Sequence, residues 1–212
     1  MNTTTFFTSY IDYFLAVRSV NLESITYANR SFADQAVLLV QQEHFLPGFA
    51  LPALIALAIV AWRLRNQQAV SMPCSMRSAV LWTVLATLCS FAYYLTGASG
   101  FTSVEIGPVL SIVLIISELL RFMRLAPGER FVPRLDVGSM FVITYLQLLF
   151  ADVVVSVGGG MGITWLGGVG LNDALIRTPL VLAAFTGLAM VLMKTLRDRD
   201  LAAAASRGAL VS

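Results

Sequence analysis

The sequence has few charged residues, two cysteines and one histidine, and each shortage excludes a class of protein. Charged side chains make up only 12% of its 212 residues, against about 25% in a typical soluble domain. Cys74 falls in a predicted connection and Cys89 in an apolar run, so a disulfide framework has no support. Two cysteines and one histidine are too few for a structural zinc site. Basic patches interleaved with aromatic residues are also missing, and we expect no metal, no cofactor and no nucleic-acid partner.

Hydrophobic residues, by contrast, make up 58% of the chain. A bilayer core of roughly 30 Å needs about 20 apolar residues per helix, so a chain of this length has room for several membrane crossings and little else. We therefore predict an all-α, polytopic membrane helical bundle. The transmembrane bundle would cover 46–196, with about five helices at 46–62, 79–95, 105–123, 137–157 and 178–196.

The first 45 residues predict an amphipathic helical hairpin at the outer face or interface. Apolar residues recur there at helical spacing, at Phe7, Tyr10, Ile11, Phe14 and Leu15. Ser31 and Asp34 have the spacing of a capping box, and predict a second helix that runs to about Phe45 and is ended by Pro47 and Gly48. Because the first basic residue is Arg18, we expect no cleaved signal peptide, so that insertion depends on internal segments.

The basic residues predict the orientation. Eleven of the 14 follow the first, third and fifth predicted spans: Arg63, Arg65, Arg77, Arg121, Arg124, Arg130, Arg134, Lys194, Arg197, Arg199 and Arg207. The positive-inside rule then puts the 197–212 tail in the cytoplasm and the N-terminal region outside. We interpret the chain as a multi-pass protein of the cell membrane, taken as a bacterial inner membrane. A further crossing hidden in the N-terminal region would instead place that region inside.

Asp152 is a carboxylate inside the fourth predicted span, where charge is costly. One interpretation is a proton- or cation-binding group in a pathway. The other, which the sequence favours, is a carboxylate near the outer interface that hydrogen-bonds to a neighbouring helix. Tyr145 and Gln147 lie on the same span and complete this candidate polar site.

A glycine-rich connection follows, and ends in Asp173 and Arg177. These two are four residues apart and predict an ion pair on a short outer helix capped by Asn172. Gly168 and Gly170 permit tight turns, so the segment is a candidate outer loop site. A pore mouth is one interpretation, and a flexible outer loop is the favoured one.

Glu118 and Arg121 are three residues apart on the third predicted span. They predict a local ion pair on one helical face.

Two features of the sequence resemble short motifs of intramembrane hydrolases. The sequence Gly97-Ala-Ser-Gly100 resembles the Gly-x-Ser-Gly of rhomboid proteases, which implies a serine nucleophile. That family needs a histidine on another span, whereas His44 lies outside the predicted spans. Asp152 and Asp173 resemble the two aspartates of prepilin peptidases, but the Gly-x-Gly-Asp of that family is absent from 168–173. Neither resemblance assigns a family, and we predict no catalytic residue.

Three functional classes remain. The favoured one is a non-catalytic subunit or scaffold of a larger membrane assembly, such as a secretion, conjugation, defence or envelope complex, because connections are short and helix faces carry small residues. The alternative is a small homo-oligomeric channel or transporter, in which one Asp152 per protomer becomes a ring. An intramembrane hydrolase is the least favoured. The expected partners are the lipid bilayer and either further copies of the chain or other membrane subunits.

Overall fold

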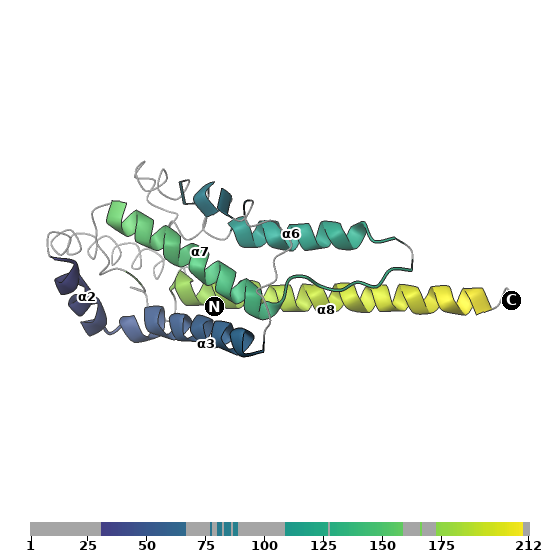
Figure 1. Ribbon diagram of the computed structural model, residues 1–212, viewed down its shortest axis with the longest axis horizontal. Helices are drawn as coiled ribbons and strands as arrows, with labels where there is room; N and C mark the ends of the chain where they lie inside the picture. The colour runs from purple at the N-terminus through teal and green to yellow at the C-terminus, as the bar shows by residue number, and fades with distance from the viewer. Residues whose placement is uncertain are drawn as a thin grey trace, which may run out of the picture.

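The computed structural model is built of helices joined by connecting segments (Figure 1). It describes residues 31–66, 77, 80, 81, 83–85, 87, 88, 109–126, 128–158, 166 and 173–209. Their helices are α2 (Phe32–Gln41), the π-helix η1 (Phe45–Ala50), α3 (Leu51–Arg65), α6 (Val109–Met123), α7 (Val137–Gly158) and α8 (Ala174–Ala209). No strand occurs in this part of the chain. The prediction of an all-helical protein is confirmed.

Within the described residues, three helical stretches are long and apolar enough to cross a membrane: Phe45–Arg65, Val137–Val154 and Ala174–Ala204. They correspond to the first, fourth and fifth predicted spans. The second predicted span lies mostly outside the described residues, as do the glycine-rich connection and the Phe7–Leu15 stripe. The third predicted span is described only from Val109, as the 15 residues of α6, and a total of five spans stays a prediction.

The second N-terminal helix begins where the sequence predicts, at the Ser31 cap. The Ser31 hydroxyl accepts a hydrogen bond from the Asp34 amide at 3.2 Å and donates one to the Asp34 carboxylate at 2.7 Å. However, α2 ends at Gln41 rather than Phe45. Pro47 and Gly48 do not break the chain, because they lie in η1, which runs directly into α3. Pro47 is tolerated there since the first turn of a helix has unpaired amides in any case.

α7 packs against α8 through small residues. A Cβ at Gly187 would lie 2.9 Å from Cγ2 of Val137, closer than real Cβ contacts, so only glycine permits this approach. Ala183, one turn earlier on α8, is buried in the same interface. Small residues at these two positions let the helices approach each other closely. The core that joins α3, α7 and α8 consists of Ala56, Phe141, Val142, Tyr145, Leu148, Leu175 and Ala183.

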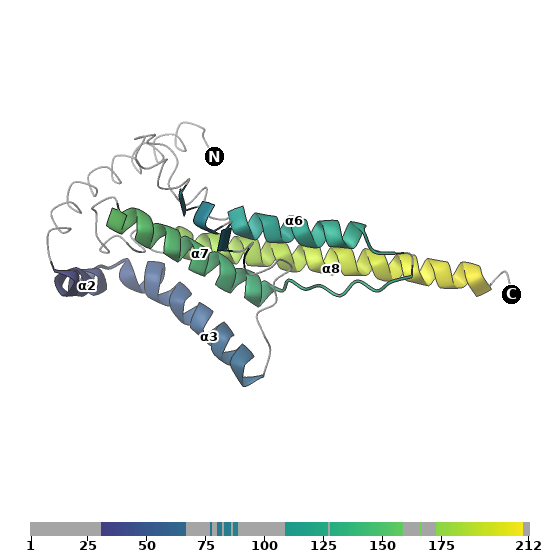
Figure 2. The same ribbon diagram turned by 45° about the horizontal axis from the view of Figure 1, so that its top comes forward.

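α6 is displaced along α8 relative to α3 and α7, as Figures 1 and 2 both show. The end of α3 and the start of α7 are level with Gly187, because Val137 contacts Gly187 and Arg63 lies beside Gly138. The turn after α6 instead contacts Arg197. Ten helical residues separate Gly187 from Arg197, or about 15 Å at 1.5 Å per residue. The bundle therefore has a step at its basic end, where α6 and its following connection continue beyond α3 and α7.

α8 is longer than predicted at both ends. It begins at Ala174 and contains Pro179, which is fully buried. Proline in the second turn costs one backbone hydrogen bond without ending the helix, so the predicted short outer helix is the first turn of α8. The predicted tail, 197–212, is helical to Ala209, and this end of α8 projects past the other helices (Figure 1).

Candidate functional site

The fold brings together the two carboxylates that the sequence places 21 residues apart. Asp152 lies near the end of α7 and Asp173 directly before α8, and their carboxylates interact electrostatically. Asp173 is also the side-chain cap of α8, since its carboxylate accepts a hydrogen bond from the Leu175 amide at 2.9 Å. Asp152 is half-buried. Two acidic groups thus meet at the end of the bundle opposite the basic step.

Of the two polar residues predicted to accompany Asp152, only Tyr145 shares its helical face. Seven residues, or about two turns, separate Tyr145 from Asp152, and Tyr145 is buried in the core between α3, α7 and α8. Gln147 lies on another face of α7. Its side chain is 3% exposed, and neither atom of its amide has a hydrogen-bond partner. Gln147 is therefore a buried amide that stands apart from the carboxylate pair.

The candidate outer loop site is described only at its end. Gly168 and Gly170 lie outside the described residues. The Arg177 side chain is exposed, and its backbone amide donates to the Asp173 carbonyl at 2.9 Å as part of the first turn of α8. Asp173 serves as the helix cap, the role that the sequence suggested for Asn172.

At the opposite end, Asp136 joins α3 to α7. Its carboxylate forms an ion pair with Arg63 from the last turn of α3. It also accepts hydrogen bonds from the Ser139 amide at 3.0 Å and the Ser139 hydroxyl at 2.7 Å, which makes it the cap of α7. Burial raises the pKa of the Asp136 carboxyl, but the hydrogen bonds from Ser139 and the charge of Arg63 outweigh it and hold the pKa below its usual range.

Glu118 organises the connection between α6 and α7. Its side chain is fully buried and accepts hydrogen bonds from Arg121 at 2.7 and 3.0 Å, as the sequence predicts. It also accepts one from the Arg134 amide at 2.9 Å, which draws the connection back onto α6. Arg121 in turn donates to the Val132 carbonyl at 2.5 Å and lies over the Phe131 ring, 5.0 Å from its centroid.

The far end of the same connection is held by α8. The Arg197 side chain donates to the Glu129 carbonyl at 2.8 Å and to the Ala126 carbonyl. Phe131 packs with Met190 and Met193 of α8 in a small separate core. The described residues of 124–136 thus form a folded element that is bound to α6 and α8.

Two polar features were not predicted from the sequence: the contacts of Asp136, and the buried hydroxyl pair of Ser111 and Thr144, whose oxygens are 2.7 Å apart. A signal for the first exists, since an aspartate directly before a long apolar run is typical of a helix cap. Its partner Arg63 is 73 residues away, and no local pattern predicts that pairing.

Of the polar contacts described above, the pair of Asp152 and Asp173 is the one with possible chemical activity. The contacts of Asp136, Glu118 and Arg197 hold the fold together. Nearby carboxylates raise each other's affinity for a proton or a cation. The described residues contain no cluster of three or more His, Cys, Asp or Glu side chains that could hold a metal ion. No protein family, curated protein or solved structure matches the chain, and the function has to be argued from these contacts alone.

Proposed function

We propose that this protein is a non-catalytic subunit or scaffold of a larger membrane assembly. The observation that carries the proposal is the projecting end of α8. Its last contact with the connection is at Arg197, yet the helix continues to Ala209, a further 18 Å or so. Most described side chains of this extension are exposed. A helix that leaves the bundle with its surface uncovered is suited to attach to another subunit.

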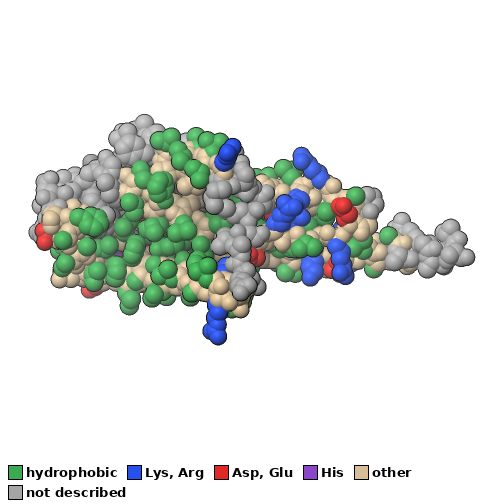
Figure 3. All heavy atoms as spheres, in the orientation of Figure 1, with side chains coloured by type: hydrophobic (Ala, Val, Ile, Leu, Met, Phe, Trp, Pro, Cys, Tyr) green, Lys and Arg blue, Asp and Glu red, His purple; other side chains and the backbone are tan. Residues whose placement is uncertain are grey.

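The internal contacts support the same proposal. The ion pair of Arg63 with Asp136 joins α3 to the start of α7. Glu118, which pairs with Arg121 on α6, accepts a hydrogen bond from the Arg134 amide and so holds the connection to α6. Apolar side chains cover the outside of the helices (Figure 3), as expected of a bundle in contact with lipid or with neighbouring subunits.

The experiment is purification in mild detergent of the full chain and of a chain truncated after Asp200. We expect a foreign membrane protein to co-purify in fixed proportion with the full chain and to be lost on truncation, because truncation removes the projecting helix. Far-ultraviolet circular dichroism and gel filtration check that the truncated bundle is folded. A homo-oligomer without a foreign partner would contradict the subunit role.

The proposal includes five membrane crossings in a bacterial inner membrane, with the projecting helix in the cytoplasm. A reporter active only in the cytoplasm should work after Arg65, Arg130 or Arg207 and fail after Gly100 or Gly168. The physical reason is the concentration of basic residues at the first three positions. Cytoplasmic activity at Gly168 would eliminate the five-span topology.

A channel or transporter is a second candidate, favoured by the proximity of Asp152 and Asp173. In a homo-oligomer each protomer would add one carboxylate pair to a ring. The test compares Asp152→Asn, which removes the charge but keeps the shape, with Asp152→Leu, which removes both. If Asp152 is structural, the Asn variant folds normally and the Leu variant yields less folded protein.

The same variants are then measured for proton and potassium flux after reconstitution in liposomes. Wild-type flux that disappears in a normally folded Asn variant would support the channel over the subunit. Equal flux through wild type and the Asn variant would exclude Asp152 from a pathway.

A further inference from the structure

The helix α2 turns its large apolar side chains away from the bundle. Phe32, Val37 and Val40 are 72%, 56% and 60% exposed. Gln35 is polar, yet it is buried on the opposite side of the helix together with Leu39. A surface helix of a water-soluble domain has the reverse arrangement, with its apolar stripe on the core and its polar side chains outside. An exposed apolar face of this kind marks a surface that something covers.

The exposed face also has a polar edge. Successive residues of a helix are about 100° apart, which puts Val37 and Val40 on one side of α2. The exposed Asp34 and Gln41 are seven residues, or two turns, apart and lie together at one edge of that side, whereas Phe32 lies toward the other edge. A helix at a membrane surface has this pattern, because its apolar side meets acyl chains and its polar edge meets headgroups and water.

The chain holds α2 close to the start of a membrane-spanning segment. α2 ends at Gln41, and the apolar segment that is long enough to cross a membrane begins at Phe45. The Phe45 amide donates to the Gln42 carbonyl at 3.0 Å, which folds the connection into a turn, and α2 contacts η1. Figures 1 and 2 both show α2 set across the direction of α3 at the end of the bundle. With α3 across a bilayer, α2 therefore lies along the bilayer surface.

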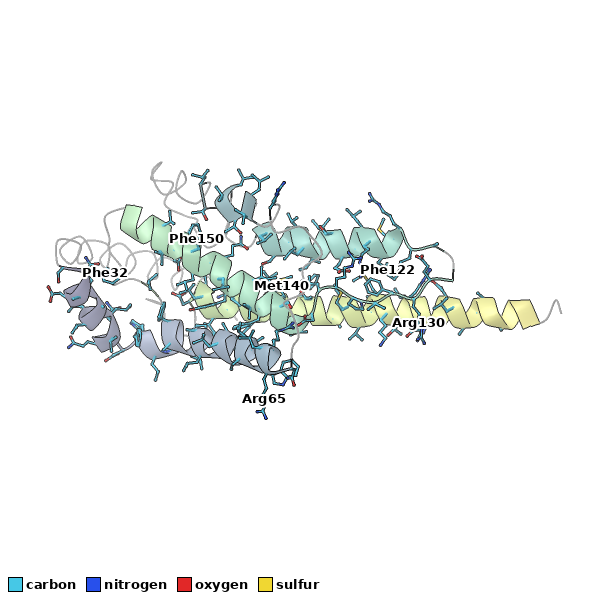
Figure 4. The ribbon with its side chains drawn as sticks, in the orientation of Figure 1. Phe32, Arg65, Phe122, Arg130, Met140 and Phe150 are labelled. Carbon is cyan, nitrogen blue, oxygen red and sulfur yellow. The ribbon has the colours of Figure 1, made fainter. Side chains whose placement is uncertain are left out.

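The hydrophobic surface continues from α2 onto the next two helical segments. Leu46 of η1 and Leu51 and Leu54 of α3 are exposed. Figure 3 shows hydrophobic side chains spread over this half of the molecule, and Figure 4 places Phe32 at the end opposite Arg130.

This part of the chain has no positive charge. No Lys or Arg occurs between Ser31 and Trp62. Surface helices are held by the apolar area that they bury and by the attraction of their cations to anionic lipids. Because α2 lacks cations, only the apolar contact remains, and the charge of the headgroups should not matter.

We propose that α2 is an interfacial anchor, whose Phe32, Val37 and Val40 insert among the acyl chains of one leaflet while Asp34 and Gln41 face the headgroups. The occupant of the exposed face is lipid, of either headgroup charge. The proposal requires that α3 crosses the membrane, and it is independent of the subunit role.

The experiment uses nitroxide spin labels on single cysteines of the full chain in phosphatidylcholine liposomes, with both native cysteines replaced by alanine. Labels at Val37→Cys and Val40→Cys test the exposed face, and labels at Asp34→Cys and Gln41→Cys on the same helix are the matched controls. A label at Leu57→Cys, on the exposed side of α3, reports whether α3 lies in the bilayer. Collision rates are measured with oxygen, which concentrates in hydrocarbon, and with a water-soluble nickel chelate. Circular dichroism and gel filtration check that each variant is folded.

We expect the labels at Val37 and Val40 to collide often with oxygen and rarely with the nickel chelate, and the labels at Asp34 and Gln41 to show the reverse. The same ratios should hold in liposomes that contain phosphatidylglycerol, and insertion that occurs only with phosphatidylglycerol would overturn the proposal. Frequent nickel collisions at all four positions would place α2 in water and overturn it. Shielding of Val37 and Val40 from both reagents would mean that protein covers the face, either residues 1–30 or a second copy, and would overturn it as well.

The label at Leu57 separates the failure of this proposal from the failure of the membrane crossing. Frequent nickel collisions there would show that α3 is outside the bilayer, and would overturn the crossing and the anchor together. An oxygen-rich Leu57 beside nickel-accessible labels at Val37 and Val40 would overturn the anchor alone.

A charge placed on the exposed face provides a second measurement. Val40→Asp should raise the nickel collision rate of the Val37 label severalfold, because a carboxylate is costly in hydrocarbon. Gln41→Asp adds the same charge at the polar edge and should leave that rate unchanged. Equal effects of the two substitutions would show that the two sides of α2 do not differ in environment, and would overturn the proposal.

Discussion

Replacing Glu118 with leucine should destabilise the protein more than any substitution at an exposed charge. The fully buried carboxylate accepts three hydrogen bonds, two from Arg121 and one from the Arg134 amide. Breaking a buried ion pair by removing one partner costs about 3 to 5 kcal/mol. Arg121 keeps its contacts with Val132 and Phe131 and is partly exposed, which places the expected cost at the lower end, at about 3 kcal/mol. Glu118→Gln retains one acceptor and should cost about 1 to 2 kcal/mol.

The assay is thermal unfolding of the purified protein in detergent, followed by tryptophan fluorescence. For a chain of this size each kcal/mol corresponds to about 2 to 4 °C, so Glu118→Leu should lower the melting temperature by about 10 °C and Glu118→Gln by about 5 °C. Glu129→Gln is the control, because Glu129 is exposed and accepts a single hydrogen bond. It should melt within about 2 °C of wild type.

A double variant distinguishes the ion pair from simple packing. Replacing both Glu118 and Arg121 with leucine removes the unpaired charge along with its partner, and should melt at a higher temperature than Glu118→Leu alone. The reasoning would be refuted if Glu118→Leu melted like wild type, or if Glu129→Gln fell by the same amount.

Three further predictions use the same assay. Gly187→Ala should lower the free energy of unfolding by about 1 kcal/mol, because the new Cβ would lie 2.9 Å from Cγ2 of Val137. Adding Val137→Ala should restore this stability. A double variant as unstable as Gly187→Ala alone would show that the strain does not arise from Val137. Gln147→Leu should raise stability by about 1 kcal/mol or more, since it removes a buried amide without partners; a lower melting temperature would mean that the amide binds something. Because the pKa of Asp136 is lowered from 3.8, its ionised form stabilises the fold above about pH 4 and this contribution is lost as the pH falls through the lowered value. Wild type should therefore lose stability on acidification by more than Asp136→Asn, and parallel curves would contradict the assignment.

The all-helical fold and the central parts of three apolar helices could be predicted, because both depend on local composition. The Ser31 cap, the Glu118–Arg121 pair and the small residues Ala183 and Gly187 are also local patterns, each within four residues, and all are found in the structure. Helix ends were harder to predict. Pro47 was expected to end a helix, and Pro179 falls at the predicted start of the fifth span. Both lie inside helical segments, because packing outweighs the loss of one backbone hydrogen bond.

Contacts between residues far apart in the chain could not be predicted from local sequence patterns. Asp152 and Asp173 were each identified as candidates, but their proximity depends on how α7 and α8 are joined and packed. The pairing of Arg63 with Asp136 likewise requires the crossing of α3 and α7. The sequence groups Gln147 with Asp152 because both lie on one predicted span, whereas a separation of five residues along a helix puts the two side chains on different faces.

The step between α3 and α8 also bears on how the protein responds to bilayer thickness. From Gly187, level with the end of α3, to Lys194, the first basic residue after the apolar part of α8, the helix rises about 10 Å. If both helices cross the membrane as proposed, the two sides of the bundle match hydrocarbon layers of different depth. A uniform bilayer would then satisfy one side only, and tilting of the helices or local thinning beside α3 would absorb the difference. Membrane thickness would thus set the angle at which the projecting end of α8 leaves the surface.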